Sequence, residues 1–297
     1  MIEEKECPLC GSKELKKKLD CKDHSNTQET FTIVNCRYCD FTFTNPRPLD
    51  KNLEKYYKSE NYISHTNSNT GFFNFIYQSI RKHTTEKKCK LIKMLISKGS
   101  LLDVGCGTGE FLHTCKNAGY NVVGIEPAKI ARDQAIGNYK LNVSAKTDLN
   151  QFDKNEFDII TMWHVLEHVT DINSYLEKIH KILKHKGKIV VAVPNHKSWD
   201  AKYFGSYWAA WDVPIHVSHF TENTIKGFFK KFGYSHYKTK PMYYDSFYVS
   251  LLSSEYLNGR KNYIKSFLLG LASNMYAFFS KNGYSSQIYI FEKEKKD

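Results

Sequence analysis

Cysteines near the N-terminus are the first residues whose spacing could do chemistry. Of the 8 cysteines in the chain, Cys7 and Cys10 form one C-x-x-C pair, and Cys36 and Cys39 form another. Each pair makes a turn that presents two thiolates to one ion, and four thiolates form the closed tetrahedral set of a structural zinc site. Because the acidic N-terminus lacks the apolar segment of a signal peptide, we expect a cytoplasmic chain, in which clustered cysteines favour a metal over disulfides. We therefore predict a structural Zn in a small ribbon over residues 1–50.

A glycine turn in the middle of the chain is the second such group. It lies between an apolar segment ending at Val104 and a helical segment starting near Glu110. Glycine lets the backbone bend sharply and approach a ligand, and the N–H groups of the following helix point at that ligand. Glu126 ends the next apolar segment, roughly 20 residues on, where a carboxylate can accept hydrogen bonds from ribose hydroxyls. The candidate cofactor-binding residues of this region are Asp103, Gly105, Cys106, Gly107, Thr108, Gly109, Glu126 and Pro127.

The string D-x-G-x-G-x-G followed by Glu126 resembles motif I and the second-strand acid of class I S-adenosylmethionine (SAM) methyltransferases. A dinucleotide fingerprint, G-x-G-x-x-G, would need glycine at Glu110, and the carboxylate of Asp103 suits an ammonium group better than a pyrophosphate. The resemblance spans roughly residues 99–194 and implies SAM as cofactor, with S-adenosylhomocysteine as product. It also places Asp148 near the adenine, and Met162 and His164 beside the methionine half of the cofactor.

Alternating apolar and amphipathic segments predict the elements that would position these residues. Such βα alternation indicates an α/β, doubly wound, mostly parallel sheet of the Rossmann-like methyltransferase type, and the family adds an antiparallel seventh strand. The strands are expected near 100–104, 121–126, 141–145, 157–162, 187–193, 234–240 and 287–292, and the helices near 109–118, 128–136, 172–184 and 221–232.

An aromatic and histidine-rich insert over 196–220 separates the fifth strand from its helix. Its string D-x-P-x-H-x-x-H-F is similar to one found in a subgroup of small-molecule methyltransferases. Imidazole titrates near neutral pH, so His164, His216 and His219 are the candidate catalytic bases, with a structural histidine as the alternative. A metal on the H-x-x-H pair would need a further ligand from elsewhere. Glu167 and His168 are interpreted as residues that hold the turn after the fourth strand.

The predicted organisation is a ribbon over 1–50, a helical linker and lid over 51–98, and a methyltransferase core over 99–297 with inserts at 196–220 and 241–283. The polar stretch 64–71 is the expected lid, and Tyr62 belongs to an aromatic cluster ahead of it. An apolar helix is expected over 263–279, too short to span a bilayer. It is interpreted as a core or homodimer helix, or as a cap for a lipophilic substrate or a membrane-surface contact.

Net charge bears on the partner of this chain. A formal charge of +12 is compatible with nucleic-acid binding. Most of the basic residues are lysines, however, and recognition of phosphates and bases favours arginine. We therefore predict methyl transfer to a small-molecule acceptor, lipophilic or sugar-like, at an O, N or C nucleophile. An RNA methyltransferase and a non-catalytic SAM-binding module are the alternatives. Arginine occurs at Arg37, Arg47, Arg81, Arg132 and Arg260.

Overall fold

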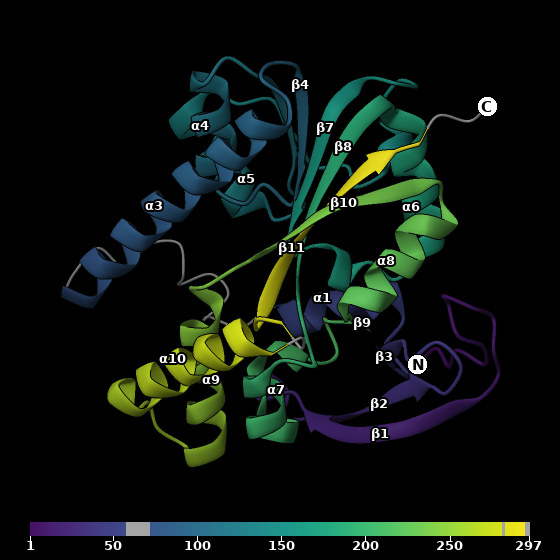
Figure 1. Ribbon diagram of the computed structural model, residues 1–297, viewed down its shortest axis with the longest axis vertical. Helices are drawn as coiled ribbons and strands as arrows, with labels where there is room; N and C mark the ends of the chain where they lie inside the picture. Colours follow the sequence, from purple (N-terminus) through teal and green to yellow (C-terminus); the bar gives the residue numbers. More distant parts are fainter. Residues whose placement is uncertain (58–71, 281–282, 295–297) are drawn as a thin grey trace.

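A large twisted β-sheet forms the centre of the protein in a computed structural model that describes residues 1–57, 72–280 and 283–294 (Figure 1). It has 7 strands in the order β10-β11-β8-β7-β4-β5-β6. Strand β11 is antiparallel to both of its neighbours, and the strands from β8 to β6 are parallel. The predicted doubly wound, mostly parallel seven-stranded sheet is confirmed. Its strands are β4 (Ser100–Val104), β5 (Asn121–Ile125), β6 (Val143–Ser144), β7 (Phe157–Trp163), β8 (Leu183–Pro194), β10 (Tyr234–Pro241) and β11 (Ser286–Lys293).

Helices cover both faces of this sheet (Figure 1). On one face α3, α4 and α5 share a buried cluster with residues of β4, β5, β8 and β11. On the other face α6 and α8 pack against the opposite sides of the same strands. Parallel strands covered on both faces must be apolar throughout, as the run from Ile189 to Val193 is. The helices are α3 (Phe72–Leu95), α4 (Glu110–Asn117), α5 (Lys129–Tyr139), α6 (Ile172–Ile182) and α8 (Glu222–Lys231).

Helix α6 shows how local sequence sets these layers. Its apolar residues recur at helical spacing, from Ile172 through Leu176 to Ile179, and all are buried against the sheet. The Asp171 side chain accepts a hydrogen bond from the backbone N–H of Ser174 and so caps the first turn. The pattern and the cap together fix where the helix begins and which face it buries.

The N-terminal ribbon forms a second sheet of 4 strands in the order β1-β2-β3-β9 (Figure 1). One of its strands ends at Cys36 and another starts at Thr42, on either side of the second C-x-x-C pair, and a longer strand precedes both. The last strand of this sheet comes from the histidine-rich insert: Thr42 pairs with His219 and Phe43 with Ser218. The ribbon and the insert therefore share one sheet. Its strands are β1 (Leu15–Lys22), β2 (Thr30–Cys36), β3 (Thr42–Thr44) and β9 (Ser218–His219).

Short helical elements complete the region at the carboxyl ends of the parallel strands. These are α1 (Asp50–Tyr57), η1 (Leu149–Gln151), η2 (Leu166–His168), α7 (Trp199–Phe204), η3 (Gly205–Tyr207), η4 (Ala209–Trp211), α9 (Asp245–Asn258) and α10 (Tyr263–Phe279). The predicted apolar helix is α10, and it packs against α9 and α7 (Figure 1). The predicted lid at 64–71 and Tyr62 lie outside the described residues.

Helix α10 leaves much of its apolar surface uncovered. Ile264, Phe278 and Phe279 are 78%, 75% and 82% exposed. Along the described parts of the chain, no helix combines the length and apolarity that crossing a bilayer requires.

A buried carboxylate, Asp200 of α7, holds these C-terminal elements together. Its Oδ2 accepts hydrogen bonds from Trp208 Nε1 at 2.8 Å and from Ser285 Oγ at 2.6 Å. Its Oδ1 accepts one from Ser273 Oγ of α10 at 2.7 Å. The side chain is fully buried, so these three donors replace the hydrogen bonds that water would otherwise make to the carboxylate. One residue thus joins the insert to α10 and to the segment that leads into β11.

Replacing this carboxylate should destabilise the fold. We expect Asp200→Ala to lower the free energy of unfolding by about 3–5 kcal/mol, because it leaves three buried donors without an acceptor. Asp200→Asn keeps the volume and part of the bonding, so its loss should be smaller. Chemical denaturation of both variants measures the difference, and equal stability of wild type and Asp200→Ala would contradict this role.

Candidate functional site

The glycine turn lies between β4 and α4, as the sequence predicts, and two glycines are required by the geometry. Gly105 has φ 69°, and a Cβ there would lie 2.6 Å from Cγ2 of Val165, in the segment after β7. Gly107 has φ 55°, and a Cβ there would meet nothing within 4 Å. The first glycine therefore permits close packing of two strand ends, whereas the second leaves open space above the turn.

Glu126 lies directly against this turn. Its Oε2 accepts a hydrogen bond from the N–H of Gly107 at 2.9 Å, and its Oε1 accepts one from the N–H of Ala128 at 2.8 Å. Burial raises the pKa of this carboxyl, while the two backbone N–H groups favour its ionised form. Arg132 donates to the carbonyl oxygens of Glu126 and Pro127 and holds the loop in place. The turn and the acid therefore form one preorganised unit at the ends of two neighbouring parallel strands.

Asp103, the acid within β4, is almost fully buried. Its Oδ1 accepts a hydrogen bond from Thr161 Oγ1 of β7 at 2.6 Å. Burial raises the pKa of this carboxyl to about 7, although the Thr161 bond and the charge of Lys88 oppose the rise. A cationic ligand beside Asp103 would favour its ionised form, so the position suits an ammonium group.

The remaining predicted cofactor residues lie in different environments. Thr108 Oγ1 donates to Glu110 Oε2 at 2.6 Å and accepts from Arg81 of α3. Cys106 and Met162 are buried in the apolar clusters on the two faces of the sheet. Asp148 is exposed, accepts from the N–H of Asn150 and pairs with Lys178 at 3.2 Å. Contact of these side chains with a cofactor stays a prediction.

His164 is engaged at both ring nitrogens. It follows β7 with φ 58°, and its Nδ1 lies 3.2 Å from Glu167 Oε1 while its Nε2 lies 3.0 Å from Asp245 Oδ2. Burial lowers the pKa of His164, but hydrogen bonds to the two carboxylates outweigh burial and raise it to about 10. Two carboxylates therefore flank the ring and favour its protonated form, while a role for His164 as a base stays a prediction. The sequence offered no local signal for Asp245, which starts α9 far along the chain.

The two insert histidines have different hydrogen-bond partners. His219 is buried, and its Nε2 lies 3.0 Å from Thr44 Oγ1 of the ribbon. Burial lowers the pKa of His219 well below its usual value, so it is neutral. His216 instead approaches Glu167 and His168, whose ligand atoms lie within 4.8 Å of its own. The structure therefore groups His216 with two residues that were interpreted as turn residues, and a catalytic role for the predicted histidines stays a prediction.

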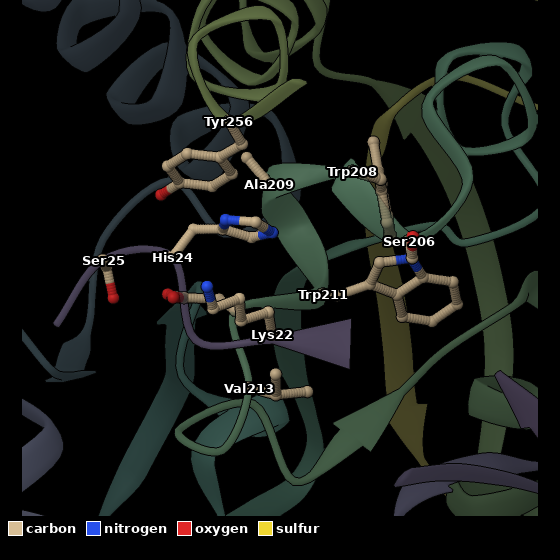
Figure 2. Close-up of a pocket in the computed structure, with 10 residues that line it drawn as sticks. Lys22, His24, Ser25, Ser206, Trp208, Ala209, Trp211, Val213 and Tyr256 are labelled. Carbon is tan, nitrogen blue, oxygen red and sulfur yellow. The ribbon is translucent and has the colours of Figure 1, made fainter. Parts of the chain in front are cut away.

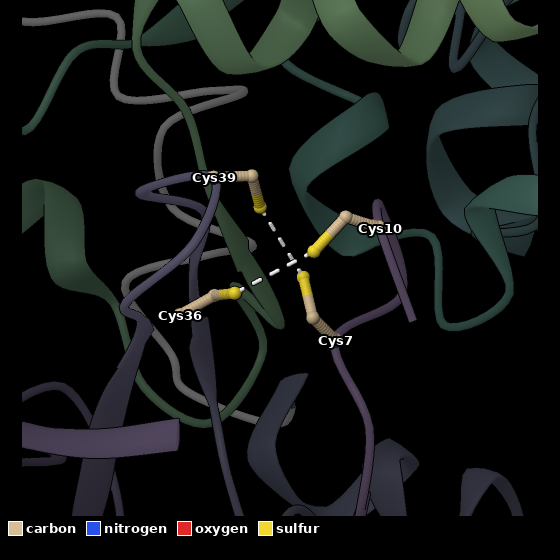
Figure 3. A group of neighbouring side chains, drawn as sticks. All are labelled: Cys7, Cys10, Cys36 and Cys39. Carbon is tan, nitrogen blue, oxygen red and sulfur yellow. Dashed lines mark hydrogen bonds between the residues drawn. The ribbon is translucent and has the colours of Figure 1, made fainter. Parts of the chain in front are cut away.

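The four ribbon cysteines converge as the sequence predicts (Figure 3). The sulfur atoms of Cys7 and Cys39 are 3.5 Å apart, and those of Cys10 and Cys36 are 3.6 Å apart. A tetrahedral zinc with bonds of about 2.3 Å needs sulfur atoms about 3.8 Å apart. The residues present therefore fit zinc, and a ribbon sheet of this size has little core of its own without a metal.

A small pocket lies between the end of β1, the insert and α9 (Figure 2). The ring of His24 stacks on that of Tyr256, with centroids 4.8 Å apart, and the indoles of Trp208 and Trp211 form another wall. The pocket is remote in sequence from the glycine turn and includes Asp212, a neighbour of His216.

Comparison with known proteins identifies the family of this chain. A family model described as a methyltransferase domain matches residues 77–238, which is more than half of the chain. Ubiquinone biosynthesis O-methyltransferase of Pelagibacter ubique (strain HTCC1062) is 32% identical over 126 residues, covering 40% of this chain and 49% of that protein. The same enzyme of Bartonella tribocorum (strain CIP 105476 / IBS 506) is 33% identical over 115 residues, covering 36% and 46%. The chain thus spans about half the length of the curated relatives it matches.

Solved structures share the fold. A SAM-dependent methyltransferase from Archaeoglobus fulgidus superposes with a TM-score of 0.51 at 18% identity, over 75% of this chain and 100% of that chain. Magnesium protoporphyrin IX methyltransferase (ChlM) from Synechocystis PCC 6803, with bound SAH, gives a TM-score of 0.54 at 13% identity, over 82% and 100%. The solved structures share this fold, and the family model shows that the chain belongs to the methyltransferase-domain family.

Proposed function

We propose that this protein transfers the methyl group of SAM to a hydroxyl group of a small, lipophilic, hydroxylated aromatic acceptor. The observation that carries the proposal is the preorganised unit of the glycine turn and Glu126, whose carboxylate is already oriented by two backbone N–H groups. SAM supplies an activated methyl group, so the protein mainly has to align it with the acceptor and exclude water.

Each part of this cofactor site has a proposed role. Glu126 accepts hydrogen bonds from the ribose hydroxyls, and Asp103 interacts with the ammonium group. Gly105, Gly107 and the N–H groups at the start of α4 allow close approach of the methionine portion. Cys106, Thr108, Gly109, Pro127, Asp148 and Met162 are proposed to line the remainder of the site.

The identity of the acceptor is supported by two observations. The curated relatives are named as O-methyltransferases of ubiquinone biosynthesis, which supports an oxygen nucleophile on an aromatic ring precursor for this chain. The exposed apolar surface of α10, beside the elements at the carboxyl ends of the strands, supports a lipophilic acceptor. In the reaction an oxygen lone pair of the acceptor forms the new O–C bond, the C–S bond breaks with its electron pair passing to sulfur, and the hydroxyl proton is released.

Methyl transfer should depend on both the acceptor hydroxyl and Glu126. With methyl-labelled SAM, we expect label to enter a catechol that carries an apolar tail, and not the matching dimethoxy compound or total RNA. Glu126→Gln should raise the dissociation constant for SAM at least tenfold, because the variant lacks the charged acceptor for the ribose hydroxyl groups. Calorimetry measures that constant, and Glu156→Gln on the surface is the control. Transfer of the label to RNA, with none to the catechol, would overturn the proposal.

Asp103→Asn should separate stability from cofactor binding. A buried carboxyl whose folded pKa is raised to about 7 is destabilising once ionised, and this cost grows as pH rises from about 4 to above 7. The variant removes the ionisation, so we expect its stability gain over the unliganded wild type to be about 1–3 kcal/mol larger at pH 8 than at pH 5. SAM affinity should fall at least tenfold because the ammonium loses its anion. Thermal melts at both pH values test the stability change, and calorimetry tests the loss of SAM affinity. A stability gain that does not depend on pH would argue against the buried ionisation as its cause.

We also propose that the ribbon cluster binds one structural zinc ion. Four thiolates leave no open coordination position, so the ion would hold the ribbon sheet and not take part in methyl transfer. The pairing of β3 with β9 extends its influence to the insert.

Purified protein should contain one zinc per chain at this cluster by elemental analysis. Cys36→Ser should lose that zinc and lower the melting temperature, because metal binding contributes folding free energy. Cys21→Ser is the matched control: this buried ribbon cysteine is outside the cluster, so the zinc content should be unchanged. Retention of zinc in Cys36→Ser would exclude the proposed ligand set.

A further inference from the structure

We propose that Glu167, His168 and His216 form a second metal site, one that takes a divalent first-row transition-metal cation. Their ligand atoms lie within 4.8 Å of one another. The site is separate from the cysteine cluster, and it stands independently of the acceptor proposed above. Ligands at about 2.0–2.2 Å from one ion are about 3.4 Å apart in a tetrahedral arrangement, so binding needs the ligand atoms to move closer by up to about 1.4 Å.

The hydrogen bonds of both imidazoles prepare them for coordination. His216 Nδ1 lies 3.0 Å from the carbonyl oxygen of Ala210. His168 Nδ1 lies 3.2 Å from the carbonyl oxygen of Ile215 and 3.2 Å from the Tyr57 hydroxyl, which can accept from the same N–H. A carbonyl oxygen only accepts, so each Nδ1 carries the proton and each Nε2 keeps its lone pair. Metal-ligating histidines typically show this arrangement, in which the second nitrogen donates to a backbone carbonyl or carboxylate.

Glu167 supplies the third ligand. Its side chain is only 1% exposed, and its Oε1 is paired with His164 Nδ1. Its Oε2 is buried and, among the residues that the structure describes, has no hydrogen-bond partner. An unpaired buried carboxylate oxygen is costly, and a cation between it and the two imidazoles would satisfy it.

Backbone bonds fix the three ligands on elements that are far apart in sequence. Glu167 and His168 belong to η2, while His216 lies just before β9. The N–H of Val217 donates to the carbonyl oxygen of Glu167 at 2.9 Å, and Thr44 of the ribbon donates to the carbonyl oxygen of Val217. The site is therefore held without a bound ion. Asp212 Oδ2, 3.8 Å from His216 Nε2, is within reach as a further oxygen ligand.

The donor set indicates the class of metal. Two imidazole nitrogens and a carboxylate suit Zn²⁺, Fe²⁺, Co²⁺ or Mn²⁺ and leave coordination positions for water or another ligand. The cysteine cluster, with four soft thiolates, selects zinc over Mn²⁺. Mn²⁺ therefore distinguishes the two sites in one molecule.

The test is a titration with Mn²⁺ of the full chain loaded with only one equivalent of zinc, which the four thiolates of the cysteine cluster take up, followed by electron paramagnetic resonance. We expect one equivalent to bind, with couplings from two imidazole nitrogens in a pulsed experiment. Glu167→Gln and His216→Gln should each weaken Mn²⁺ binding at least tenfold. His196→Gln, at a buried histidine of the same insert that is outside the cluster, should bind Mn²⁺ as the wild type does.

The nitrogen couplings in the wild type keep the proposal testable even if a variant fails to fold. Absence of bound Mn²⁺ in the wild type would overturn it, as would bound Mn²⁺ without imidazole couplings. Unchanged affinity in folded Glu167→Gln and His216→Gln would do the same. Because the readout is metal binding, its failure is distinct from a failure to detect methyl transfer.

Discussion

The antiparallel pairing of β3 with β9 is the constraint on which the arrangement of the site depends. It joins Thr42 and Phe43 of the ribbon to His219 and Ser218 of the insert. Thr44 adds a backbone bond to Val217 and a side-chain bond to the carbonyl oxygen of His216. The N–H of Val217, in the same segment, donates to the carbonyl oxygen of Glu167 and joins the insert to the core. The ribbon thus places the histidine segment against the ends of the parallel strands.

A second constraint comes from the parallel strands themselves. Their carboxyl ends meet at one edge, so the turn after β4, the acid after β5 and the histidine segment after β7 are neighbours although 60 positions separate Asp103 from Trp163. Gly105 shows how close these ends are. A Cβ at Gly105 would collide with the side chain of Val165, which follows β7. Turn chemistry and strand order therefore specify the same site.

The sequence predicted the parts of this structure that are encoded locally. Apolar strands alternating with amphipathic helices indicated the sheet, and two C-x-x-C pairs indicated the converging cysteines. Contacts between distant segments carried no such signal. The pairing of His164 with Asp245 joins β7 to α9, and β9 is a strand of only two residues whose pairing partner lies in the ribbon. Nothing in the local sequence distinguishes Asp200, and only the fold shows the three donors that surround it.

The charge state of His164 follows from the same long-range geometry. A histidine after the fourth strand is a reasonable candidate for a base when only its position is known. Two carboxylates, one from η2 and one from α9, instead stabilise the imidazolium against the effect of burial. His164 Nδ1 lies 3.2 Å from Glu167 Oε1, while Glu167 Oε2 has no hydrogen-bond partner among the described residues. His164 thereby positions a carboxylate that we propose as a metal ligand.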